Sequence, residues 1–268
     1  MPEKYVHVDG IATFVRHVGA TTLPEKPPDL SRGETVVCLH CATGNSALFT
    51  ELLERLGTAH SPLAFDRPGH ARSGSLDAPD SVAGGAAHTQ ALLGALGVRQ
   101  CVLLGESLGG MVALEAALAA PELVRGLVLI STRVRGELPD AQLEQLRLVT
   151  EGKARREFDR ALYSASTAPD LMRRGFMEDL KTDPRVVHQN ALALRGFDRE
   201  RDLGRVRCPV LVVVGADDAE SRAAAEGLAS GLANARIVEI PKCARRVSLG
   251  GAGPLAEAVL GFLAELPR

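Results

Sequence analysis

The sequence contains no tryptophan, few aromatic residues (3%) and almost no net charge. Its 31 Lys and Arg against 33 Asp and Glu give a formal charge of -2, which excludes the basic footprint of a nucleic-acid or anionic-membrane binder. No apolar run reaches the roughly 18 residues of a membrane span. The N-terminus, MPEKYVHVDG, also lacks the apolar core of a signal peptide. We therefore expect a cytoplasmic protein with no nucleic acid and no membrane partner; its oligomeric state stays open.

Motifs for common cofactors and metals are absent as well. Neither a G-x-G-x-x-G nor a P-loop sequence occurs, so we expect no organic cofactor. The five cysteines are an odd number, and most lie in or beside strand-like runs, where buried free thiols are usual. His40, Cys41 and Cys243 do not have a recognised metal-ligand spacing, so we expect no metal.

Short apolar runs alternate with longer amphipathic stretches along most of the chain. The runs at 5–8 and 12–17 flank Asp9-Gly10 and predict an opening hairpin. Continuous Val, Leu and Ile runs are typical of strands buried on both faces of a parallel sheet. Such runs lie at 35–40, 62–65, 101–105, 123–131, 210–215 and 236–240, and helical patterns lie at 48–56, 82–96, 108–119, 219–232 and 254–266. The fold class is therefore α/β, a mostly parallel doubly wound sheet.

The strand pattern is interrupted between residues 133 and 200. Pro139, Pro169 and Pro184 punctuate this stretch as the first residues of helices would. We expect a helical cap at 133–200, inserted into a core formed by 1–132 and 201–268. Ligands bind at the carboxyl edge of open α/β sheets, which is where such an insertion would lie.

The segment CVLLGESLGG predicts a sharp turn between a strand and a helix. Gly105 and Gly109 flank Ser107, and they permit a backbone path that larger side chains would obstruct. The turn would expose Ser107 at the end of a strand, next to the first amides of a helix. This is the pattern of a nucleophile elbow.

These segments resemble the α/β-hydrolase superfamily, in its cap-bearing branch of small-molecule hydrolases, over nearly the whole chain. LHCATG resembles that family's oxyanion loop, DRPGHARSG resembles its Asp-x-Pro-Gly-His-Gly-x-Ser turn, and VVVGADD resembles the strand that delivers the acid. The resemblance implies that Ser107 is the nucleophile and that the backbone amides of Ala42 and Leu108 form the oxyanion hole. It also implies Asp218 as the acid, with Asp217 as the alternative.

The histidine of the family's Ser, acid, His order is missing. The chain has Ile240-Pro241-Lys242-Cys243-Ala244-Arg245 where the family has a segment like Ile-Pro-x-x-Gly-His, and no histidine follows His188. A guanidinium has no free lone pair, so Arg245 cannot accept the serine proton. We expect Arg245 to form a bidentate pair with Asp218. The residues Cys41, Ala71 and Ala244 also replace family glycines.

Other residues could serve a substrate or replace the base. His40 borders the oxyanion loop and His188 lies in the cap, so either could reach the pocket, although structural and solvated roles are more usual; His70 belongs to the Pro-Gly-His turn. Cys41 and Cys243 map to the pocket rim. We assign Arg245, His40, Cys41 and His188 as candidate substrate-binding residues. A Cys41–Cys243 disulfide would be unusual in a reducing compartment.

Three functions remain open. The first is a serine enzyme that acts on a small acyl, ester, lactone or thioester substrate and whose Ser-His-Asp triad departs from the family pattern. The second is a lyase, cyclase, decarboxylase or isomerase, in which the oxyanion hole stabilises an enolate and Arg245 binds a substrate carboxylate. The third is a ligand-binding protein without catalysis, and fold alone does not choose among them.

Overall fold

A computed structural model describes residues 1–267 of the chain. Its centre is an eight-stranded sheet in the order β1-β2-β4-β3-β5-β6-β7-β8. The strands are β1 (Glu3–Val8), β2 (Ile11–His17), β3 (Thr35–Leu39), β4 (Ser61–Phe65), β5 (Cys101–Glu106), β6 (Val124–Ile130), β7 (Val210–Gly215) and β8 (Ala235–Ile240). The hairpin β1–β2 is antiparallel, and β2 joins β4 antiparallel. All later pairings are parallel, which confirms the predicted fold class.

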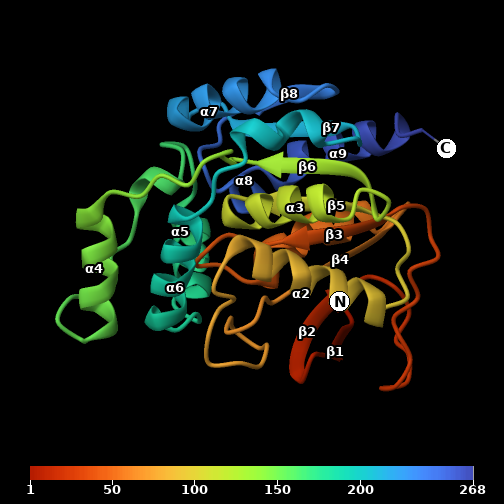
Figure 1. Cartoon of the computed structure of the whole chain (residues 1–268), viewed down its shortest axis with the longest axis horizontal. Helices are drawn as coiled ribbons and strands as arrows, with labels where there is room; N and C mark the ends of the chain where they lie inside the picture. The colour runs from red at the N-terminus through yellow and green to blue at the C-terminus, as the bar shows by residue number, and fades with distance from the viewer. Residues whose placement is uncertain (268) are drawn as a thin grey trace.

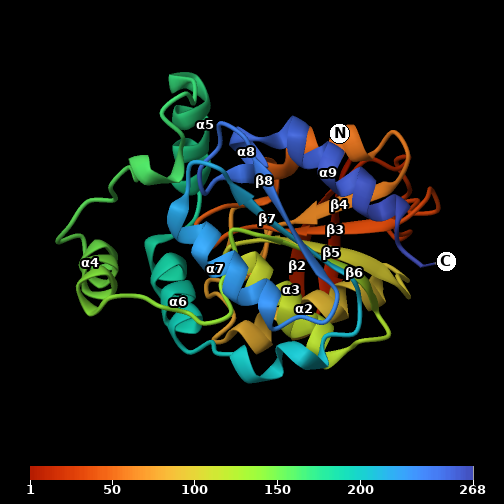
Figure 2. The ribbon, with the colours of Figure 1, turned by 90° about the horizontal axis from the view of Figure 1, so that it is seen from above.

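Two layers of helices cover the sheet. The helices α1 (Thr50–Leu56) and α9 (Ala252–Ala264) pack on one face. The helices α2 (Val82–Ala95), α3 (Leu108–Ala119) and α7 (Ala219–Ser230) pack on the other, as Figure 2 shows. The strands β3 to β7 between them consist almost entirely of buried residues, which accounts for their continuous apolar sequences.

Three helices lie between β6 and β7 in the sequence, beside the edge where the parallel strands end (Figure 1). They are α4 (Asp140–Thr150), α5 (Pro169–Asp179) and α6 (Pro184–Arg195). Pro169 and Pro184 are the first residues of their helices and Pro139 immediately precedes α4, as predicted. We propose that residues 133–200 form the cap and that 1–132 with 201–268 form the core; residue 268 itself lies outside the described residues.

A few local elements differ from the sequence prediction. The helix expected at 48–56 is divided into a 3-10 turn (Ser46–Phe49) and α1. A short helix, α8 (Val247–Gly250), follows Arg246 and was not predicted, because four residues are too few for a helical period. The hairpin turn is confirmed, with Asp9 and Gly10 both at positive φ. Within residues 1–267, no helix is both long and apolar enough to cross a membrane.

Candidate active site

Ser107 lies in a strained turn between β5 and α3. Its backbone has φ 55° and ψ -118°, a region that residues with a side chain rarely adopt. Both flanking glycines are required by close contacts. A Cβ on Gly105 would lie 2.3 Å from the carbonyl oxygen of Gly109, and a Cβ on Gly109 would lie 2.1 Å from that of Leu39. The structure therefore has the backbone of a nucleophile elbow at Ser107.

The amides of Ala42 and Leu108 are free donors near this turn. Leu108 is the first residue of α3, so its N–H has no partner within the helix. Neither amide has a hydrogen-bond acceptor among residues 1–267. Leu108 is buried and Ala42 half-buried, and an unpartnered buried N–H is uncommon in a folded protein. Two such amides can donate hydrogen bonds to a carbonyl oxygen and stabilise the negative charge that develops on it.

Arg245 occupies a network of charges rather than a simple pair. Its Nε donates to Oδ2 of Asp218 over 3.1 Å, and its Nη2 donates to Oε2 of Glu220 over 2.6 Å. Arg133 forms an ion pair with the other oxygen of Glu220. The expected bidentate Arg245–Asp218 pair is therefore wrong in detail, because the two arms of the guanidinium contact different carboxylates.

Asp218 contacts residue 245, whereas Asp217 does not. Asp218 caps α7, accepts two hydrogen bonds from Ser221 and is 7% exposed. Burial alone would raise its pKa, but the hydrogen bonds from Arg245 and Ser221 outweigh burial and hold the pKa of Asp218 below its usual value. Asp217 instead accepts a hydrogen bond of 2.5 Å from the hydroxyl of Ser164, which lies between α4 and α5.

Both ring nitrogens of His40 and of His70 are occupied within the protein. His40 is fully buried; its Nδ1 bonds to the Cys41 carbonyl and its Nε2 accepts from the Arg67 amide. His70 bonds through Nδ1 to Pro68, and its Nε2 is 2.8 Å from the Asn190 side-chain nitrogen. Because the Cys41 and Pro68 carbonyl oxygens can only accept, each ring is assigned its proton on Nδ1 and accepts at Nε2. Burial and the Arg67 charge lower the pKa of both rings, that of His70 to about 3.

His188 lies on α6 and is half-buried. No histidine nitrogen contacts the Ser107 hydroxyl in the part of the chain that the structure describes, 1–267. The serine consequently has no imidazole base.

The sequence analysis did not identify Arg246, which lies deeper in the protein than Arg245. Its guanidinium is 4% exposed and forms two parallel bonds of 3.0 and 2.9 Å with Asp179, the last residue of α5. Nearby, the buried Glu106 accepts hydrogen bonds from the amide and hydroxyl of Ser248. The only sequence feature pointing to Arg246 was its position next to Arg245, since no pattern pairs residues 67 positions apart.

Cys41 and Cys243 are both buried free thiols. Cys41 packs with Leu48, Tyr163 and Leu249, a small apolar cluster between the core and the cap segment. Burial raises the pKa of Cys41, and raises that of Cys243 to about 12, so neither is a thiolate at neutral pH. Their side chains therefore fill space between layers.

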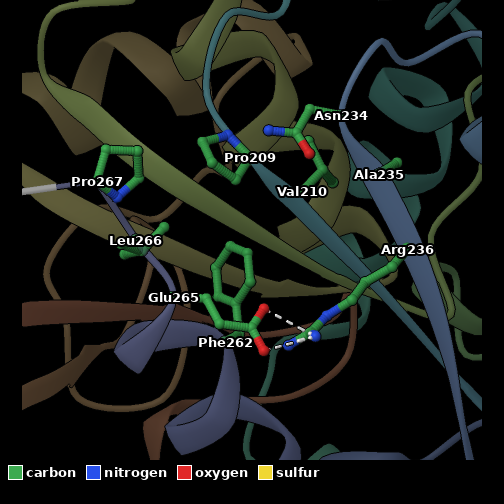
Figure 3. Close-up of a pocket in the computed structure, with 9 residues that line it drawn as sticks. All are labelled: Pro209, Val210, Asn234, Ala235, Arg236, Phe262, Glu265, Leu266 and Pro267. Atoms are coloured by element: carbon green, nitrogen blue, oxygen red, sulfur yellow. Dashed lines mark hydrogen bonds and ion pairs between the residues drawn. The ribbon is translucent and has the colours of Figure 1, made fainter.

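A surface hollow of about 190 Å³ lies far from these residues (Figure 3). It is bounded by Val210 and Ala235, the first residues of β7 and β8, and by the end of α9. The ion pair between Arg236 and Glu265 lies across it. Because Ser107 is at the opposite, carboxyl end of the strands, this hollow has no part in the chemistry of the elbow.

Comparison with known proteins gives the same family. Residues 36–250 match the alpha/beta hydrolase family. The chain belongs to this family. It is 30% identical to a putative carbamate hydrolase RutD of Variovorax paradoxus, over 87% of this chain and 93% of that protein. It is 29% identical to a pimeloyl-[acyl-carrier protein] methyl ester esterase of Xanthomonas oryzae, over 89% and 98%. It also superimposes on a thermophilic esterase from Thermogutta terrifontis with a TM-score of 0.85 at 22% identity, over 99% of both chains.

The family match covers the candidate active site, from Val36 in β3 to the end of α8. The chain is accordingly an enzyme of the hydrolase superfamily. Arginines occupy positions 245 and 246, in the segment after β8 where the resemblance led us to expect a histidine.

Proposed function

We propose that this hydrolase acts on a small acyl, ester, lactone or thioester substrate through Ser107, without an imidazole base. The observation that carries the proposal is the elbow itself. The backbone is held at φ 55° at Ser107, and the amides of Ala42 and Leu108 have no acceptor in the described part of the chain. A strained turn persists only where the surrounding structure enforces it, and such turns cluster at active sites.

The reaction would proceed by addition to the carbonyl carbon. The Ser107 oxygen forms a bond to that carbon while the carbonyl electron pair moves to oxygen, which the Ala42 and Leu108 amides would stabilise. The Ser107 proton must pass to water or to a basic group of the substrate, because Arg245 cannot accept it. A serine without a base is a weak nucleophile, so turnover of simple esters should be slow.

The named relatives support carbonyl chemistry. The RutD relatives are described as putative carbamate hydrolases and the Xanthomonas relatives as methyl ester esterases. Both substrate types place a heteroatom leaving group on a carbonyl carbon. A small acyl substrate is the class that the named relatives share and that a serine in a nucleophile elbow could attack.

The decisive experiment compares p-nitrophenyl acetate and butyrate hydrolysis by the parent, Ser107→Ala and Arg245→His. We expect slow turnover in the parent that is lost in Ser107→Ala. Arg245→His places an imidazole beside Asp218 and should raise kcat by about a hundredfold, the low end of what a positioned general base contributes. Parent turnover that survives Ser107→Ala would refute the proposal.

A second candidate is a non-hydrolytic lyase, cyclase, decarboxylase or isomerase reaction. The absence of an imidazole contact to Ser107 within residues 1–267 favours it, because an enolate needs the oxyanion hole but no activated nucleophile. Arg245 as a carboxylate binder is weakened by Asp218 and Glu220, which already neutralise its charge. This candidate predicts no ester turnover in the parent and a gain in ester turnover in Arg245→His.

The binding-only function has a different signature. It is favoured if the parent, Ser107→Ala and Arg245→His all lack activity while a small molecule raises the melting temperature.

A further inference from the structure

Arg67 is a buried guanidinium without a carboxylate partner. It follows β4, is 3% exposed, and has no Asp or Glu oxygen within 4.0 Å anywhere in residues 1–267. Over the same range of residues, the Arg67 Nε has no hydrogen-bond acceptor. Burial lowers the pKa of Arg67 to about 10, so the group remains charged at neutral pH. A buried charge without a counter-charge costs folding free energy, so the presence of a guanidinium at this position needs an explanation.

The Arg67 guanidinium contacts the Cys41 carbonyl group and, more weakly, the His70 ring, whose Nε2 lies 3.4 Å from Arg67 Nη2. Its Nη2 donates to the Cys41 carbonyl oxygen over 3.2 Å. The same oxygen accepts from His40 Nδ1 over 2.8 Å and from the Gly44 amide over 3.3 Å. Three donors, one of them cationic, therefore converge on a single peptide oxygen.

That oxygen belongs to the peptide unit whose nitrogen is Ala42. Residues 1–267 contain no cis peptide bond, and in a planar trans unit the C=O and N–H bonds point in opposite directions. The carbonyl is held toward Arg67 and His40, so the Ala42 N–H points away from them. Donation to a peptide oxygen also polarises the attached N–H and makes it a stronger donor.

We propose that Arg67 is a positioning residue that strengthens the oxyanion hole. Its charge polarises the Cys41–Ala42 peptide and so makes the Ala42 N–H a stronger hydrogen-bond donor. This inference rests on the proposed function in one respect, that Ala42 donates to a substrate oxygen. Orientation alone does not require Arg67, because His40 holds the same carbonyl with a shorter bond. What Arg67 adds is positive charge close to the site where negative charge would develop.

The test separates charge from packing with two substitutions at one position. Arg67→Gln retains a donor without the charge, and should lower kcat for p-nitrophenyl butyrate about thirtyfold, less than the hundredfold or more for loss of a donor itself. KM should change less than about twofold, because a neutral ester gains little from the charge. Arg67→Lys retains the charge and should recover kcat to within about threefold of the parent.

A pH profile of Arg67→Lys gives a readout that a structural role would not affect. A buried lysine loses its proton more readily than an arginine, so kcat of Arg67→Lys should fall between about pH 7 and 9, whereas kcat of the parent should stay level over that range because the pKa of Arg67 is about 10. This measurement compares charged and neutral forms of one folded protein, and it decides the question even if Arg67→Gln does not fold. An unchanged profile with low kcat throughout would overturn the inference.

The matched control is Arg125→Gln. Arg125 lies at the beginning of β6, at the other end of the strands, and pairs with Glu34. This substitution should leave kcat and KM unchanged. Equal kcat losses in Arg67→Lys and Arg67→Gln, with melting temperatures near that of the parent, would show that packing and not charge is involved.

Binding of n-butylboronic acid tests the role of Arg67 without requiring that the protein hydrolyse an ester. The Ser107 oxygen forms a bond to boron, its proton passes to solvent, and the tetrahedral boronate carries the negative charge. Calorimetry should give Ser107-dependent binding that weakens about thirtyfold in Arg67→Gln, in step with kcat. If the parent binds boronate with this dependence but hydrolyses no ester, the proposed function fails and the role of Arg67 stands. If Ser107-dependent binding is absent, or equal in the two proteins, the role of Arg67 is refuted.

Discussion

At the scale of single residues, three positions lack the glycine of the family pattern, and their backbone angles distinguish them. The sequence analysis treated Cys41, Ala71 and Ala244 as equal departures. Only Ala71 has a positive φ, of 39°. At the other two positions a side chain fits the backbone without strain, and Cys41 contributes to an apolar cluster. Sequence alone could not separate them, because glycine is used both for backbone angle and for close approach.

Restoring glycine at position 71 should stabilise the protein. Ala71→Gly removes the cost of a Cβ at positive φ, and we expect the free energy of unfolding to rise by about 1 kcal/mol. Ala244→Gly is the matched control. Its φ is not positive, so the added freedom of the unfolded chain should lower stability by about 0.5–1 kcal/mol. Urea unfolding followed by circular dichroism measures both, and changes of the same sign would contradict the explanation.

Among the site residues, the sequence identified the ones that local pattern determines. Ser107, Leu108 and their glycines follow from a ten-residue motif, and the structure places them at the predicted turn. The contact between Arg245 and Asp218 was also expected, but not the competing Glu220. Arg67 and Arg246 were missed because their roles depend on burial and on partners distant in sequence, which periodicity does not report.

At the scale of elements, the Arg246–Asp179 pair connects α5 to the loop after β8. Asp179 also accepts a hydrogen bond from Thr43, so one carboxylate contacts both that loop and the oxyanion loop. A buried ion pair contributes little net stability, but removing one partner leaves a buried charge uncompensated. This pair therefore fixes where α5 rests on the core more than it stabilises the fold.

A mutant cycle tests this interpretation. Asp179→Leu and Arg246→Met should each lower the free energy of unfolding by about 3 kcal/mol. The double variant should be more stable than either single variant, because two apolar side chains replace two charges that need each other. Denaturant unfolding of the four proteins gives the coupling energy. Strictly additive losses would indicate that the two side chains act independently.

At the scale of the whole molecule, the sheet was predictable and the arrangement of the cap segment was not. The central strands are apolar runs that alternate with helices, which indicates a parallel sheet; their order within the sheet was not predicted. The helices α4 to α6 were located by their prolines, yet nothing in their sequences showed that α4 would bury none of its residues. Helix periodicity gives the apolar face of a helix but not the neighbour that covers it.

The buried histidines make the stability of the whole molecule dependent on pH. The pKa of His70 in the folded protein is about 3, well below its ordinary value, because of burial and the Arg67 charge. Below about pH 6.5 the unfolded chain therefore binds a proton that the folded chain does not, and stability falls as the pH falls. From pH 7 to 5 this single histidine should cost about 2 kcal/mol.

Two substitutions with opposite effects test this dependence. His70→Gln keeps an acceptor for Asn190 but cannot titrate, so its stability should fall by about 2 kcal/mol less than that of the parent between pH 7 and 5. Glu106 is the opposite case, because burial raises its pKa. Its folded form holds a proton above the unfolded pKa, so it favours the folded state as the pH falls, and Glu106→Gln should make the acid loss steeper. Urea unfolding at pH 5, 6 and 7 measures both slopes, and parallel curves for the three proteins would mean that neither group titrates as its surroundings require.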